Sequence, residues 1–216
     1  MNFLDLLLLV GVGACAVWGA KRGFIRMIMI TLGLMGAIVI AVHYNDAFTR
    51  ELSGFVRASP LWVTMIAFVL SSMILFALFR LGAMLFWRVA NLQKLGKTDQ
   101  FGGALIGLIF GWIMMGYVIF LMVFLPLPAG FQTKVEESVF ALRMGSSVPL
   151  LYESTERFHP SQPDFMGKME ETLQGAMLYA KAPKSQMSKK RHITAIDEAR
   201  VSDFLDRLDR YFIASS

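Results

Sequence analysis

The chain has 216 residues, of which 56% are hydrophobic and only 17% are charged, whereas about 25% of the residues in a soluble domain are charged. Residues 1–127 carry nine basic and four acidic side chains, and residues 128–216 carry twelve of each. The basic excess lies between long apolar segments, which is typical of a membrane protein and argues against disorder, a simple cytosolic domain and nucleic-acid binding. The single cysteine, Cys15, excludes an internal disulfide framework and a cysteine-rich zinc site.

Four apolar segments are long enough to cross a membrane, which takes about 20 residues. They cover residues 3–20, 24–42, 61–87 and 101–125. Asp5 and Arg26 lie near the starts of their segments, and we expect Arg80 to lie close enough to the inner surface for its side chain to reach it. No charge is therefore expected at the midplane of any span, which argues against proton-coupled transport.

The connections between these segments alternate in charge. Lys21, Arg22 and Arg26 make the first connection basic, residues 43–60 are neutral overall, and residues 88–100 are basic again. Because cytoplasmic loops collect Lys and Arg, we expect the first and third connections in the cytoplasm and both chain termini outside it. Lys21, Arg22 and Arg26 are the residues predicted to fix this topology.

Two connections have the spacing of short amphipathic helices. Phe48, Leu52, Phe55 and Val56 form one apolar stripe, and Val89, Leu92 and Leu95 repeat every three residues between basic side chains. Each stripe fits a helix in the lipid headgroup layer or a loop packed on the bundle, and the sequence does not choose between them.

A polar tail follows the last apolar segment, which ends at Pro126 and Pro128. Residues 134–144, 164–180 and 197–213 have helical apolar spacing, and residues 185–192 read as a flexible basic linker. The predicted fold is an all-α integral membrane protein, with a four-helix transmembrane domain at residues 1–127 and a soluble helical tail at residues 128–216.

Glycines recur at helical spacing in the first and fourth segments. The glycines that we expect at helix contacts are Gly11 and Gly19 in the first segment and Gly103, Gly107 and Gly111 in the fourth, with a weaker repeat at Gly33, Gly36 and Ala37. Helix faces made of small residues let two helices approach closely in lipid. The glycine repeats therefore predict packing inside the bundle, self-association or a pore lining. Asp99 is expected to precede the fourth helix and to cap its N-terminus.

No catalytic or metal-binding pattern is present in the sequence. His43, His159 and His192 are far apart, and there is no zinc-protease, serine-hydrolase or phosphate-loop motif. We therefore expect no enzyme activity, no cofactor and no metal.

Three stretches resemble the colicin V production protein (CvpA) family of small bacterial inner-membrane proteins with four spans. They are Phe3-Leu4-Asp5 with the later Lys21-Arg22-Gly23-Phe24-Ile25-Arg26, then Lys97-Thr98-Asp99-Gln100-Phe101-Gly102-Gly103-Ala104 with Gly107, and Ser147-Val148-Pro149-Leu150. Met27 and Gln100 stand where the family pattern has an acidic residue and an arginine. The resemblance covers about residues 3–157 and implies a role in toxin production or export and in envelope homeostasis.

Two functions follow from these observations. One is a non-enzymatic accessory or scaffold protein in the bacterial inner membrane, and the other is a small homo-oligomeric channel with the glycine-rich fourth helix at the pore. The expected partners are the lipid bilayer, a second copy of the chain, and envelope or export proteins, but no nucleic acid.

Overall fold

The computed structural model describes residues 2–55, 58–90, 96–124, 134–135, 137–158, 164–181 and 195–213, which form helices and turns but no strand. Four helices are long and apolar enough to cross a membrane: α1 (Phe3–Arg22), α2 (Phe24–His43), α4 (Pro60–Ala90) and α5 (Gly96–Phe124). Each covers almost all of the apolar segment predicted for it. The all-α prediction with four spans is confirmed.

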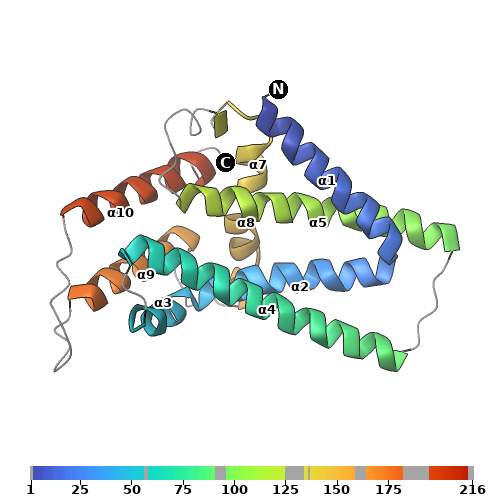
Figure 1. Ribbon diagram of the computed structural model, residues 1–216, viewed down its shortest axis with the longest axis horizontal. Coiled ribbons are helices and arrows are strands. Elements are labelled where there is room, and N and C mark those ends of the chain that lie inside the picture. Colours follow the sequence, from blue (N-terminus) through green and yellow to red (C-terminus); the bar gives the residue numbers. More distant parts are fainter. Residues whose placement is uncertain are drawn as a thin grey trace.

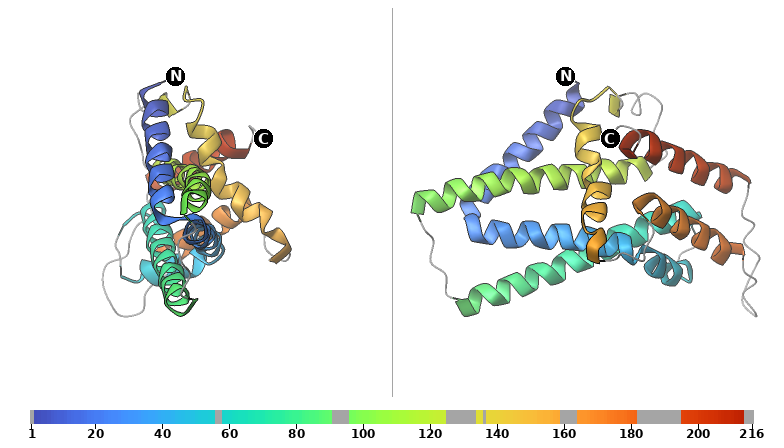
Figure 2. Two further views of the ribbon diagram at one scale, coloured as in Figure 1. Left: turned by 90° about the vertical axis from the view of Figure 1, so that its right-hand side faces the viewer. Right: turned by 180° about the vertical axis from the view of Figure 1, so that it is seen from behind.

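The four long helices alternate in direction. In Figure 1, α2, α4 and α5 run lengthwise, and α1 slants across α5. The junction of α1 with α2, the end of α4 and the start of α5 lie at one end of the bundle, which we call the basic end because it holds Lys21, Arg22 and Lys97. The other end, which we call the tail end, holds the start of α4, the end of α5 and the last two helices of the chain (Figure 2).

A single residue, Gly23, separates α1 from α2. Its φ of 89° lies in a region that L side chains rarely adopt, so glycine is required at this position. The N–H of Gly23 donates to the carbonyl of Gly19, and its own carbonyl accepts the N–H of Met27, both at 3.0 Å. Gly23 therefore closes one helix and opens the next.

Shorter helices lie at the tail end and across the middle of the bundle. They are α3 (Asn45–Ser53), α7 (Ala141–Gly145), α8 (Ser147–Ser154), a 3-10 turn (Glu156–Phe158), α9 (Phe165–Lys181) and α10 (Ala195–Leu208), which continues into a π-helical turn (Asp209–Ile213). The predictions for residues 164–180 and 197–213 agree with α9 and α10. The helix predicted at residues 134–144 is interrupted, because the chain turns at residues 137–140 between the helical residues 134–135 and α7.

Some predicted features lie outside the described residues. These are the proline stop at residues 126–128, Leu92 and Leu95 of the second amphipathic stripe, and the linker at residues 185–192. Of the first stripe, Phe48 and Leu52 lie in helix α3 and Phe55 in the turn after it, whereas Val56 is outside the described residues.

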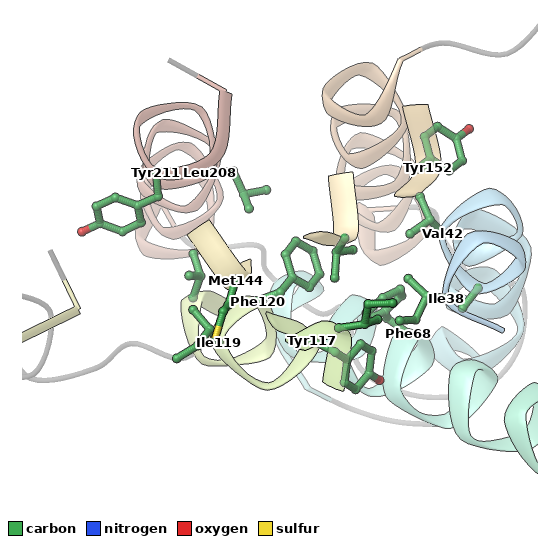
Figure 3. Packing of buried hydrophobic residues seen from close by; sticks show 14 of the residues in the cluster. Ile38, Val42, Phe68, Tyr117, Ile119, Phe120, Met144, Tyr152, Leu208 and Tyr211 are labelled. Carbon is green, nitrogen blue, oxygen red and sulfur yellow. The ribbon is translucent and has the colours of Figure 1, made fainter. Parts of the chain in front are cut away.

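One hydrophobic core crosses the predicted boundary between residues 127 and 128. Phe120 of α5 packs edge-on against Phe68 of α4 and Phe165 of α9, with ring centroids 5.6 and 5.7 Å apart. Met144, Tyr152 and Leu208 from the tail belong to the same buried cluster (Figure 3). The tail helices therefore pack on the spans, and the boundary does not separate two cores.

Candidate functional site

The closest contact between two spans is made by the glycine faces of α1 and α5. A Cβ atom added to Gly107 would lie 2.6 Å from the carbonyl oxygen of Cys15 and 2.9 Å from the Cα of Ala16. A Cβ on Gly111 would lie 2.9 Å from the Cβ of Cys15. Distances this short leave no room for any side chain, so the two backbones touch directly.

The other three predicted glycines belong to the same contact. A Cβ on Gly19 would collide with the carbonyl oxygen of Gly103, and a Cβ on Gly103 would collide with that of Gly19. A Cβ on Gly11 would lie 2.7 Å from the sulfur of Met115. All five glycines thus serve packing within one chain.

Gly33 and Gly36 of α2 also make a contact, but with α4. A Cβ on Gly33 would lie 3.0 Å from the Cβ of Phe79, and one on Gly36 would lie 3.3 Å from the Cζ of that ring. The weaker glycine repeat of the second span therefore marks where α4 crosses α2.

Asp99 closes the α1–α5 contact at the basic end. Its carboxylate accepts the N–H of Phe24 at 2.8 Å, and a Cβ on Gly23 would collide with its Oδ2. Phe24 is the first residue of α2, whose N-terminal N–H groups have no partner within the helix.

The position expected for Asp99 was wrong. Because α5 already starts at Gly96, Asp99 lies inside its first turn and not before it. Its carboxylate caps the neighbouring helix α2, a contact that the sequence alone does not reveal because the two residues are 75 positions apart.

Asp5 occupies the opposite end of α1 and is fully buried. Its Oδ2 accepts the N–H of Asn2 at 2.8 Å, within a capping box that starts the helix. Its Oδ1 accepts the hydroxyl of Ser138 at 2.5 Å and the N–H of Phe140 at 3.2 Å. Asp5 thereby ties the start of the first span to the segment that leads into α7.

Helices α7 and α8 cross the bundle between α5 and α2 (Figures 1 and 2). The crossing is possible because of Gly116, where an added Cβ would collide with the carbonyl oxygen of Met144 and lie 3.1 Å from the hydroxyl of Ser147. The side chains of Met144 and Val148 are fully buried there. Sequence reasoning missed α8 because Pro149 interrupts the apolar pattern, although proline is tolerated in the first turn of a helix.

Helix α3 turns two uncharged polar residues toward the protein and a phenylalanine outward. Asn45 and Thr49 are buried against α4 and α9, whereas Phe48 is 40% and Phe55 85% exposed. The side-chain amide of Asn45 has no hydrogen-bond partner among the described residues. This arrangement is the reverse of a helix on a soluble domain.

Ionic contacts join α3 to α9. The ammonium group of Lys168, which is almost fully buried, lies 3.5 Å from Asp46 of α3 and 3.1 Å from Glu171. The same two carboxylates line a shallow pocket of about 400 Å³ with Arg50 and Thr172. Burial, followed by the charges of Glu171, Asp164 and Asp46, raises the pKa of Tyr152 nearby.

The three basic residues expected to fix topology lie together at the basic end. The guanidinium of Arg22 lies 4.9 Å above the ring of Trp18, a cation–π distance. Lys21 is exposed and Arg26 is partly buried. Among the described residues, no group of three or more His, Cys, Asp or Glu side chains is arranged to hold a metal ion.

The fold and these contacts define a multi-pass α-helical membrane protein whose spans are joined by glycine contacts and by carboxylates at helix ends. Residues 4–149, more than half of the chain, match the family model described as colicin V production protein. The chain therefore belongs to the colicin V production protein family. No curated protein and no solved structure matches it.

The stretches that carry the family resemblance meet one another in space. Gly23 of the first stretch touches Asp99 of the second, and Gly19, which lies between the two parts of the first stretch, touches Gly103. Ser147 of the third stretch lies against Gly116 of α5. The matched region therefore contains the four spans and α7, and it reaches into α8. It ends before α9 and α10.

Proposed function

We propose that this chain is a non-enzymatic accessory or scaffold protein of the bacterial inner membrane. Membership of the family supports a part in colicin V production. In our proposal, the protein supports toxin production or export and the homeostasis of the envelope, by holding other envelope or export proteins in place.

The main support for this proposal is that the carboxylates at the helix ends are engaged in hydrogen bonds. Asp5 and Asp99 each accept backbone N–H groups, and each joins parts of the chain that are distant in sequence. A carboxylate that accepts hydrogen bonds in this way stabilises a fixed structure and is not free to act as a proton carrier. The glycine faces are likewise engaged within the chain, which removes the main reason to place α5 at a pore.

For the orientation, we propose that the basic end faces the cytoplasm. Lys21, Arg22 and Lys97 gather there, and short basic connections near span ends determine how a membrane protein inserts. On this proposal, α3, α9 and α10 face the periplasm.

The test is toxin export from a producing host in which the gene is deleted. We expect less toxin in the medium, with recovery when the native gene is supplied. Unchanged production and export in the deletion strain would contradict the proposal. If the purified protein conducts ions across a planar bilayer, the scaffold proposal is rejected and the channel is favoured.

A further inference from the structure

Arg80 lies deeper in the membrane than its position in the sequence indicates. Phe79, its neighbour in α4, packs against Gly33 and Gly36 of α2, where an added Cβ would lie 3.0 and 3.3 Å from its side chain. Helix α2 has 20 residues, Phe24–His43, and Gly33 is in its middle. At 1.5 Å per residue, the contact is about 15 Å from either end of the helix, so the backbone of Arg80 is close to the centre of the bilayer.

This depth differs from the expectation that Arg80 lies near the inner surface. Helix α4 has 31 residues, and its first turns pack against α3 and α9 at the tail end. As a result, the part of α4 that crosses the membrane is nearer to the C-terminus of this helix. A charge near the middle of a span is costly in lipid and marks a functional position.

The surroundings of Arg80 offer it no counter-charge. Arg80 is exposed, and so are its neighbours Leu78 and Leu81. Among the described residues, no ion pair or hydrogen bond to Arg80 is present.

A second copy of the chain does not supply the missing anion. The four spans contain two carboxylates, Asp5 and Asp99, which lie at opposite ends of the bilayer and bind Ser138 and Phe24. Lipid phosphates lie at the bilayer surface, and arginine reaches them readily only from near a helix end.

We propose that the face of α4 around Arg80 binds a transmembrane helix of another protein that carries an Asp or Glu near its middle. A guanidinium and a carboxylate form two parallel hydrogen bonds with charge assistance. The proposal rests on the scaffold function and names the kind of partner that the scaffold holds.

Photo-crosslinking in membranes of the native host tests this docking face. A benzoylphenylalanine at Leu81, next to Arg80, is compared with one at Leu7 of α1, since both side chains are 54% exposed. We expect a discrete protein adduct at position 81 and none at position 7. The adduct falls at least tenfold in the Arg80→Gln and Arg80→Leu variants and persists in Arg80→Lys.

Identification of the crosslinked protein completes the test. The proposal is supported when that protein has an Asp or Glu within a spanning segment and its replacement by the matching amide also removes the adduct. It is overturned when the adduct contains lipid alone or a second copy of this chain, or survives Arg80→Gln. The crosslinking experiment does not measure toxin export. Normal toxin export in the deletion strain would therefore contradict the proposed function without affecting the crosslinking result.

Discussion

Gly107 and Gly13 are both glycines in apolar spans, but their surroundings differ. Gly107 faces the backbone of Cys15 and Ala16, whereas a Cβ on Gly13 would meet nothing within 4 Å. We expect Gly107→Leu to destabilise the protein by about 1–3 kcal/mol, because the backbones must separate to admit the side chain. The thermal unfolding midpoint in detergent should fall by about 2 °C or more.

The matched control for this prediction is Gly13→Leu, which should leave the midpoint nearly unchanged. Since the glycine contact lies within one chain, neither variant should alter the oligomeric state measured by size-exclusion chromatography. Equal midpoints for the two variants would show that α1 and α5 do not touch at Gly107.

Asp99 permits a second prediction at the scale of a residue. Asp99→Ala removes the acceptor for the N–H of Phe24 and should cost about 1 kcal/mol, as loss of a helix cap usually does. Hydrogen exchange at the first turn of α2 should become faster. Asp99→Asn keeps an acceptor oxygen and should show a smaller effect, so an unchanged exchange rate in Asp99→Ala contradicts the assignment.

At the scale of elements, α3 permits a prediction about the membrane surface. Phe48 of α3 and Phe55 in the turn after it are exposed, while Asn45 and Thr49 of α3 are buried. Because α3 directly joins two spans, we expect its apolar face to lie in the headgroup layer. A spin label at Phe48, with Cys15 replaced by serine, should collide more with oxygen than with a water-soluble nickel chelate.

The control label belongs at Arg50, an exposed charged residue of the same helix. It should collide more with the nickel chelate than the label at Phe48 does. Similar nickel access at the two positions would place the whole of α3 in water.

The sequence predicts the elements that depend on local pattern. The four spans follow from long uncharged segments, and α9 and α10 follow from apolar residues spaced by three and four. The glycine repeats identify the residues at the α1–α5 contact, but they do not say which helix the faces meet. The cap by Asp99, the bonds of Asp5 to Ser138 and the ion pair of Lys168 with Asp46 join residues far apart in the chain. Their register depends on tertiary packing, which no local pattern encodes.

At the scale of the whole molecule, the direction of the bundle is open to direct measurement. Ser202 of α10 and Lys97 of α5 are both exposed and lie at opposite ends of the bundle. In a background with Cys15 replaced by serine, we expect an impermeant maleimide to label the Ser202→Cys variant in intact cells. Labelling of the Lys97→Cys variant should require disruption of the inner membrane.

The reverse labelling pattern would invert the proposed topology. Replacement of Lys21, Arg22 and Arg26 together by glutamine should make the labelling of Ser202→Cys heterogeneous, because the first connection loses its positive charge. Uniform labelling in that triple variant would show that these residues do not fix the orientation.

The bond between Asp99 and Phe24 also sets an order of events during synthesis. Phe24, just after the turn at Gly23, leaves the ribosome 75 residues before the carboxylate that caps it. At about 5–20 residues per second, that interval is about 4–15 seconds. During this time the first helical hairpin has no cap from Asp99, and its final geometry forms only when the fourth span arrives. A chain truncated before that span should therefore insert its first two helices but leave their junction loose, which makes α5 the element that completes assembly.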